Sequence, residues 1–270
     1  MQWQAAFSKL LDPYEFKARL IPGLLLLVPP ISFIALAWGA EHPIPASLSS
    51  ILVICGGPYA LAAFVRTWGQ RAQEKLFRRW GGAPSTILLR HRDQKLAEPT
   101  KQQYHQLIQT KLNIKIPNGD AERSDPRSAD AAYVAAADAL RPLAADKKKY
   151  PFVFKELVAY GFNRNCYGIR WFGLMSAAAT VLAISIHVNF LQLFPTGIHP
   201  EVFREVDVGP RLTLLLSMVL MLLWMFHFTA RTVEQAGYSY ARRLYETLSR
   251  VPKQAGAANP PKVRGVKSQS

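Results

Sequence analysis

Cysteine is scarce in this chain, which contains only Cys55 and Cys166. Two cysteines cannot form the disulfide framework of a small secreted domain. Catalytic signatures are missing too: the chain has no Gly-rich phosphate loop, no Asp-Phe-Gly string and no serine in a nucleophile elbow. The histidines and cysteines also lack the close spacing of zinc ligands. We therefore predict no catalytic residue, no metal, no cofactor and no enzymatic activity.

Charged residues are almost missing from four long stretches of the sequence. Each stretch is long enough to cross a hydrocarbon core of about 30 Å at about 1.5 Å per residue of helix. The sequence therefore predicts an all-α integral membrane protein with four transmembrane helices. The predicted spans are Leu20–Gly39, Leu48–Val65, Trp171–Phe194 and Pro210–Ala230.

Acidic residues are few, with 18 Asp and Glu against 33 Lys and Arg. In a soluble protein this excess would suggest nucleic acid as a partner, but cytoplasmic loops of membrane proteins carry the same excess. Residues 67–166 hold 18 basic and 10 acidic residues, and residues 231–270 hold 8 and 2. The two short connections between paired spans are slightly acidic. We therefore expect both termini in the cytoplasm, and no nucleic acid as a direct partner.

These patterns divide the chain into segments of distinct character. A mostly helical, basic cytoplasmic insert lies between the second and third spans, and Asp125-Pro126 is a good helix start for its alanine-rich stretch. Ile87–Asp93 fits either a short strand or the start of a helix. The expected segments are a lead-in at 1–19, spans at 20–66, the insert at 67–167, spans at 168–230, a cytoplasmic helix at 231–251 and a disordered tail at 252–270.

Helix-disturbing residues fall near the middle of both spans of the first pair. Proline removes a backbone hydrogen bond and clashes with the preceding turn, so it kinks or breaks a helix. The freed carbonyls must find protein or water as partners in a membrane. Such kinks are consistent with a gate or cavity, and equally with ordinary packing. The candidate gate residues are Pro29, Pro30, Gly56, Gly57 and Pro58.

Small and polar side chains recur every three or four residues along the third span. Ser176, Thr180 and His187 lie on this stripe. Polar groups inside a membrane face other helices or a water-filled space. We expect the stripe to face a lumen or a helix contact, and a proton relay through His187 is the less favoured alternative.

The most polar cluster of the insert is the string Arg90, His91, Arg92 and Asp93. His91 and Asp93 could form a base and its orienting group, although no nucleophile accompanies them. Arginine forks suit phosphate and carboxylate, so a site for an anionic ligand is a second interpretation. A third is a set of ion pairs that fixes the insert, with Glu156 among the acids. The residues of the tentative binding site are Arg90, His91, Arg92, Asp93, Lys155 and Arg164.

Two segments, Trp80–Asp93 (WGGAPSTILLRHRD) and Tyr150–Arg164 (YPFVFKELVAYGFNR), resemble a group of uncharacterised bacterial membrane proteins. The layout of four spans around one insert also resembles the multi-span effectors of bacterial antiphage systems. This second resemblance implies a pore-forming homo-oligomer in the bacterial inner membrane, with the lipid bilayer as partner and the insert as sensor. The alternative is a membrane protein that senses a ligand or recruits a cytoplasmic protein without conducting.

Overall fold

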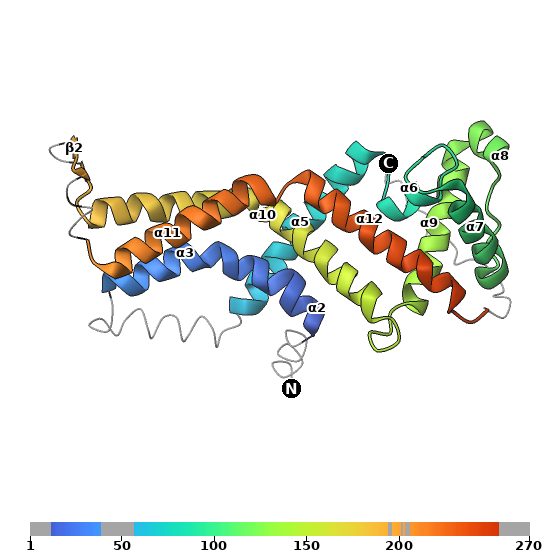
Figure 1. Cartoon of the computed structure of the whole chain (residues 1–270), viewed down its shortest axis with the longest axis horizontal. Helices are drawn as coiled ribbons and strands as arrows, with labels where there is room; N and C mark the ends of the chain where they lie inside the picture. Colours follow the sequence, from blue (N-terminus) through green and yellow to red (C-terminus); the bar gives the residue numbers. More distant parts are fainter. Residues whose placement is uncertain (1–11, 39–56, 194–195, 201, 203–205, 254–270) are drawn as a thin grey trace, which may run out of the picture. The chain divides into compact units, whose positions relative to one another are not determined.

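The chain folds into two compact units built almost wholly of helices (Figure 1). Unit 1 consists of Met1–Gly81 and Lys155–Gly237, and unit 2 of Gly82–Phe154 and Tyr238–Ser270. The computed structural model describes residues 12–38, 57–193, 196–200, 202 and 206–253.

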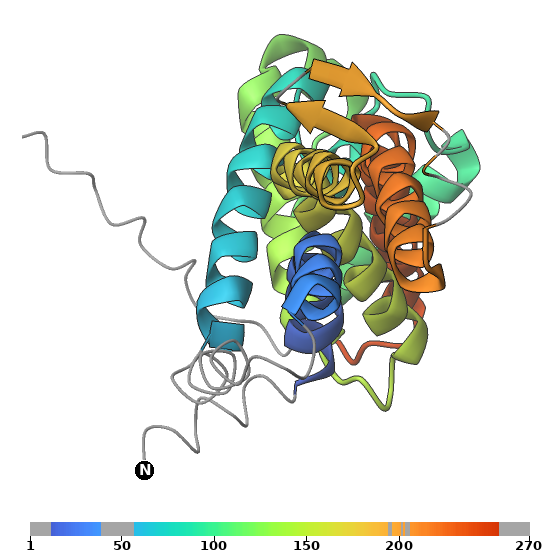
Figure 2. The same ribbon diagram turned by 90° about the vertical axis from the view of Figure 1, so that its left-hand side faces the viewer.

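Unit 1 contains the helices with the most apolar sequences. Figure 2 shows α3, α10 and α11 of this unit nearly end-on. The elements of unit 1 are α2 (Pro13–Glu15), the π-helix η1 (Phe16–Leu20), α3 (Ile21–Trp38), α5 (Gly57–Trp80), α10 (Pro151–His187), β1 (Leu191–Leu193), β2 (Thr196–Ile198), α11 (Val208–Leu222), the π-helix η3 (Leu223–His227) and α12 (Ala230–Glu246), with the first residues of α10 and the last of α12 belonging to unit 2.

Three helical stretches are long and apolar enough to cross a membrane, namely Pro13–Leu36, Pro151–His187 and Val208–His227. They overlap the first, third and fourth spans expected from the sequence, with different ends. Residues 48–56 of the expected second span, Leu48–Val65, lie outside the described residues, and residues 57–65, the other half, belong to α5. The chain is therefore predominantly helical, and its described part contains three helices that could cross a membrane.

Three glycines of α10 allow other parts of unit 1 to approach its backbone closely. A Cβ atom at Gly161 would lie 2.8 Å from the Tyr14 hydroxyl, and one at Gly168 would lie 2.7 Å from the Trp68 carbonyl. A Cβ atom at Gly173 would lie 2.2 Å from the Trp224 ring. These distances are far below van der Waals contact, so no larger residue fits without movement. The small side chains thus make α10 a common packing surface for α2, α5 and η3.

Polar side chains of α10 also hold the first membrane helix. Ser176 donates its hydroxyl to the carbonyl of Leu26 at 2.8 Å, and the Asn165 amide donates to the carbonyl of Ala18. Leu26 and Ala18 each lie four residues before a proline, Pro30 and Pro22, which has no N–H to offer them. A side chain of α10 therefore satisfies each of these freed carbonyls.

The helix α3 continues through Pro29 and Pro30 without interruption. The two prolines therefore do not break the helix, which was one of the two outcomes expected from the sequence. Deviations from α-helical hydrogen bonding occur instead at η1 and η3.

Two helix ends differ from expectation. The third span was expected to reach Phe194, but α10 ends at His187, after which Asn189 adopts a left-handed conformation with φ 58°. Asparagine tolerates this conformation, and it reverses the chain into the antiparallel hairpin of β1 and β2. The fourth span was expected to continue directly as a cytoplasmic helix. Phe228 instead leaves the helical conformation, and the hydroxyl of Thr229 accepts from the N–H of Thr232 at the start of α12.

Unit 2 is a small helical domain with its own hydrophobic core. Leu88, Ile108, Tyr133 and Leu140 are fully buried there, together with Leu244 from α12. The C-terminal segment is thus part of this core. The other elements of unit 2 are α6 (Pro84–Leu89), α7 (Glu98–Leu112), α8 (Gly119–Ser124), α9 (Pro126–Leu143) and the 3-10 helix η4 (Thr247–Ser249).

The sequence predicted the start of α9, and the predicted insert, residues 67–167, contributes to both units. The Asp125 carboxylate accepts the N–H groups of Arg127 and Ser128, as the predicted cap requires. Ile87, Leu88 and Leu89, the first residues of the ambiguous stretch Ile87–Asp93, belong to the helix α6 (Pro84–Leu89) and not to a strand. Residues 67–81 and 155–167 belong to unit 1, because they continue the helices α5 and α10 of that unit.

Candidate functional site

The arginines predicted as a binding site lie in unit 2 and are engaged by carboxylates. Arg90 forms a two-pronged contact with Asp130, with Nε–Oδ1 at 2.8 Å and Nη2–Oδ2 at 2.9 Å. Arg92 donates to Glu122 at 2.8 Å and to both oxygens of Asp130 at 2.9 and 3.0 Å. Asp93 also lies 3.5 Å from Arg90. Because carboxylates already occupy these guanidinium groups, the geometry is that of a structural ion-pair network.

Glu122 is the buried centre of this network, with 3 % of its side chain exposed. It accepts the Tyr133 hydroxyl at 2.6 Å and the backbone N–H groups of His91 and Arg92 at 2.8 and 3.3 Å. Burial would raise the pKa of Glu122, but these bonds and the Arg92 guanidinium together lower it. Burial and the neighbouring carboxylate raise the pKa of Tyr133. The network therefore holds an ionised glutamate inside the domain.

His91 and Asp93 do not form the base and orienting group considered from the sequence. The Nε2 atom of His91 lies 3.1 Å from the carbonyl of Pro117, and no hydrogen bond joins His91 to Asp93 in the described part of the chain. The buried Lys101 instead donates to the carbonyl of Asp93 at 2.8 Å and pairs with Glu98 at 3.1 Å. Lys101 thus fastens the turn that carries both residues.

His105 is buried against the same turn. Its Nε2 atom lies 2.8 Å from the carbonyl of Leu89, so Nε2 carries the hydrogen. The ring meets that of His91 edge-on, with centroids 4.8 Å apart, and stacks on Tyr133 at 6.0 Å. Burial lowers the pKa of His105. His105 is therefore neutral and packs between His91 and Tyr133, next to the ion pairs.

A surface hollow of about 360 Å³ opens beside this network. Arg92 lines it with 39 % of its side chain exposed, and Arg123 with 78 %. Arg123 pairs only with its near neighbour Asp120 among the described residues. The full lining is His91, Arg92, Gly119, Glu122, Arg123 and Pro126, and we call it the unit 2 groove.

Lys155 and Arg164, the other two residues of the predicted binding site, belong to unit 1. Lys155 is exposed. Arg164 is buried, donates to Gln73 at 2.8 Å and contacts the Asn165 carbonyl oxygen at 3.1 and 3.2 Å. The six predicted residues are therefore divided between two units, and Arg164 serves helix packing.

The third-span stripe contacts its own chain. Ser176 bonds to Leu26, as described above, and Thr180 donates to the carbonyl of Ser176 at 2.9 Å. The His187 ring meets Phe33 edge-on with centroids 5.9 Å apart. Of the candidate gate residues in the second span, Gly57 and Pro58 lie in the first turn of α5 as described, and Gly56 lies outside the described residues.

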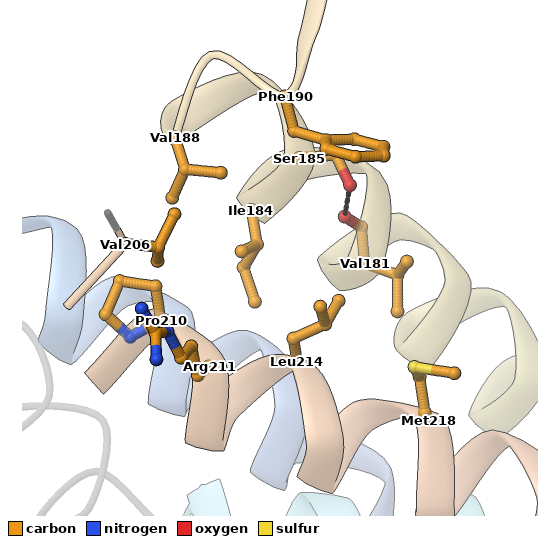
Figure 3. Close-up of a pocket in the computed structure, with 10 residues that line it drawn as sticks. All are labelled: Val181, Ile184, Ser185, Val188, Phe190, Val206, Pro210, Arg211, Leu214 and Met218. Carbon is orange, nitrogen blue, oxygen red and sulfur yellow. Dashed lines mark hydrogen bonds between the residues drawn. The ribbon is translucent and has the colours of Figure 1, made fainter. Parts of the chain in front are cut away.

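A second hollow, of about 200 Å³, lies between α10 and α11 and is lined almost entirely by apolar side chains (Figure 3). Ser185 turns its hydroxyl onto the carbonyl of Val181 at 2.8 Å. Arg211 is the one charged residue of the lining. The hollow is therefore an apolar packing gap, and its lining has no set of polar groups that converge on a substrate.

Sequence reasoning missed the acidic half of the network, Glu122 and Asp130, as well as Tyr133 and Lys101. Asp130 and Tyr133 are three residues apart in a helix, which places them on one face. Two neighbouring arginines such as Arg90 and Arg92 are expected to have acidic partners. Asp130, on the same helix face as Tyr133, was therefore the residue of the sequence that could have pointed to this network. In the described residues, no group of three His, Cys, Asp or Glu side chains is arranged to hold a metal ion.

Comparison with protein-family models, curated proteins and solved structures found no match for this chain.

Proposed function

We propose that this protein is a non-enzymatic integral membrane protein that presents unit 2 in the cytoplasm as a binding module. It sits in the bacterial inner membrane with both termini inside. The unit 2 groove recognises an anionic ligand or an acidic segment of a cytoplasmic protein, because Arg123 offers an exposed guanidinium at its edge.

The observation that carries this proposal is that polar side chains of α10 and α11 are hydrogen-bonded within unit 1, whereas the arginines of the unit 2 groove are exposed to solvent. Ser176, Thr180 and Asn165 of α10 are all hydrogen-bonded inside unit 1, as are Thr213 and Ser217 of α11. Polar side chains in membrane helices mark conduction paths when they face a water-filled space. Asn165 and Ser176 bond to the first helix. Thr180, Thr213 and Ser217 bond to the backbone of their own helices. The unit 2 groove is instead open to solvent.

A membrane-permeabilising homo-oligomer, acting in antiphage defence, is the second candidate. The carbonyls of Ala18 and Leu26, which prolines leave without helical partners, favour it. Each accepts a hydrogen bond from another helix, from Asn165 and from Ser176 respectively. Such bonds are worth about 1 kcal/mol between membrane helices. Helix rearrangement on assembly would therefore meet a small barrier at these points.

One experiment separates the two candidates. The groove variant Arg123→Glu is compared with Arg127→Glu, an exposed arginine outside the groove lining. Membrane potential is recorded in growing and in phage-infected cells, and tagged protein is purified from the same cells. A partner retained by wild type and Arg127→Glu but lost by Arg123→Glu, with unchanged potential, supports the binding module.

Depolarisation by wild type after infection supports the permeabilising effector. If the potential stays unchanged and Arg123→Glu retains whatever wild type retains, both candidates are contradicted.

A further inference from the structure

A third hollow, of about 220 Å³, lies between α5 and α10 in unit 1. On α5 its lining residues are spaced by three, four or seven positions, so they share one helix face. On α10 they fill little more than one turn. The two sets combine three cations with three aromatic rings. We call this the basic–aromatic pocket, and its lining is Trp68, Arg71, Ala72, Lys75, Tyr167, Gly168, Arg170 and Trp171.

The pocket exists because the two helices touch backbone to backbone at one point. A Cβ atom on Gly168 would lie 2.7 Å from the backbone of Trp68 and Gly69. Large side chains cannot enter such a contact, so those next to it must extend to either side. Arg71 and Arg170 lie next to the contact, within three residues of Trp68 and Gly168. The crossing itself therefore places cations from both helices around a common space.

Aromatic rings hold the two guanidinium groups. The Cζ atom of Arg71 lies 5.1 Å from the Trp68 ring centroid. That of Arg170 lies 4.6 Å from the Trp171 ring and 5.5 Å from the Tyr167 ring. A guanidinium over an aromatic face keeps its edge free for hydrogen bonds. The rings thus fix the arginines in position and leave their N–H donors available.

No carboxylate neutralises these cations within the described residues. Arg71, Lys75 and Arg170 take part in none of the ion pairs found there, in contrast to Arg90 and Arg92 of unit 2. Three positive charges around a small hollow repel one another, and an anion in the hollow relieves that repulsion. The pocket therefore has the charge of a site for a phosphate or a similar anion.

Apolar groups adjoin the pocket on the membrane side of the same helices. Phe172 meets Trp68 with ring centroids 5.0 Å apart and Phe64 at 5.4 Å. Trp171 is 62 % exposed and Met175 67 % exposed. Tryptophan at the end of an apolar helix is typical of the headgroup level of a bilayer. The anion site thus borders directly on a surface suited to acyl chains.

We propose that the basic–aromatic pocket binds the phosphate of an anionic glycerophospholipid, whose acyl chain lies along Phe172 and Met175. Basic pockets between membrane helices on the cytoplasmic side are suited to such headgroups. A free phosphate would use the cations alone, whereas a lipid also uses the exposed apolar surface beside them. The proposal depends on the membrane insertion of α10 and on neither function proposed above.

The test uses the full chain in mild detergent, with bound lipid counted by native mass spectrometry. Phosphatidylglycerol, zwitterionic phosphatidylcholine and inorganic phosphate are added separately. The double variant Arg71→Gln/Arg170→Gln is compared with Arg78→Gln/Arg79→Gln, which removes the same charge from exposed positions of α5 outside the pocket. Lys75→Gln, at an exposed position, is a third variant in case the double variant does not fold.

We expect wild type and the Arg78/Arg79 variant to retain phosphatidylglycerol in preference to phosphatidylcholine. The pocket variant, which lacks two cations, should bind it about 30-fold more weakly, and Lys75→Gln about fivefold more weakly, because each cation near a headgroup contributes about 1 kcal/mol. Equal retention by all variants would overturn the proposal. Inorganic phosphate that displaces the lipid completely at matched concentration would show a free-phosphate site instead.

Discussion

The Ser176 hydroxyl donates to the carbonyl of Leu26 at 2.8 Å, and this carbonyl is the one that Pro30 leaves without its helical partner. The hydrogen bond that the first membrane helix lacks is thus supplied by another helix. Asn165 does the same for Ala18, four residues before Pro22. Proline in this helix therefore creates acceptors that select the face of α10 against which the helix packs.

The coupling between Ser176 and Pro30 can be measured directly. Ser176→Ala should destabilise the protein by about 1 kcal/mol, because it leaves a buried carbonyl without a donor. In a Pro30→Ala background the N–H of residue 30 can donate to the carbonyl of Leu26, so Ser176→Ala should cost much less stability there. Reversible unfolding in mixed micelles gives the four stabilities. An equal cost in both backgrounds would show that the bond does not compensate for the proline.

The contact at Gly168 should tolerate no side chain. Gly168→Ala places a Cβ atom 2.7 Å from backbone atoms of Trp68, and backbone yields less readily than a side chain. We expect a loss of about 1–3 kcal/mol, typical of overpacking. Gly119→Ala is the control, since its Cβ would meet only His91 at 3.9 Å. Thermal unfolding in detergent should show a lower midpoint for the first variant alone.

The ion pairs of unit 2 depend on the shape of guanidinium as well as on its charge. Arg90→Lys keeps the charge but cannot make two parallel bonds to Asp130. We expect it to cost unit 2 about 1–2 kcal/mol, because a charge-assisted bond of the buried arginine is lost. Arg127→Lys, at an exposed position, should cost nothing measurable. Urea unfolding followed by amide exchange in α9 peptides tests both, and a tolerated Arg90→Lys would contradict the two-pronged contact.

Acid should weaken unit 2 in two stages. The pKa of His105 is lower in the folded protein than its ordinary 6.5, so the unfolded chain binds more protons and stability falls once the pH drops below about 6.5. The slope is at most about 1.4 kcal/mol per pH unit for one group. Glu122, whose pKa is lowered from 4.5, adds a second loss as the pH falls below that value.

His105→Gln should remove the first stage and leave the second. Amide exchange of α7 and α9 peptides, corrected for the intrinsic pH dependence, reports both stages. A first stage that persists in His105→Gln must come from another group.

Orientation is tested with reporters at three positions. A reporter inserted at Asp120 or fused at Ser270 should lie in the cytoplasm, and one at His199 should lie outside, because the basic segments remain inside. Accessibility of single cysteines to an impermeant reagent checks the same points. Labelling of Asp120 from outside would reverse the orientation and remove unit 2 from the cytoplasm.

Hydropathy and capping patterns were sufficient to predict several helices of this fold from the sequence. Runs almost free of charge predicted spans at Leu20–Gly39, Trp171–Phe194 and Pro210–Ala230, which overlap three helices long and apolar enough to cross a membrane. Asp125-Pro126 predicted the start of α9. These features depend on neighbouring residues, so a single sequence contains them.

Long-range partners are less accessible to sequence analysis. Arg90 and Arg92 were recognised as a cluster, but their carboxylates are 30 to 40 residues away. The partner of Ser176 is 150 residues away. A polar residue in an apolar run has many conceivable acceptors, and only the helix arrangement selects one. The same limit explains why the C-terminal segment was not assigned to unit 2.

The core of unit 2 combines Leu88 and Tyr133 with Leu244 and Leu248, which follow the last membrane span. During synthesis the residues of the first group leave the ribosome long before those of the second. Until the C-terminal segment arrives, the earlier helices expose the apolar faces that it later covers. Completion of unit 2 therefore waits for the synthesis of α12, and a chain truncated before α12 would present an incomplete core to the quality-control proteases of the cell.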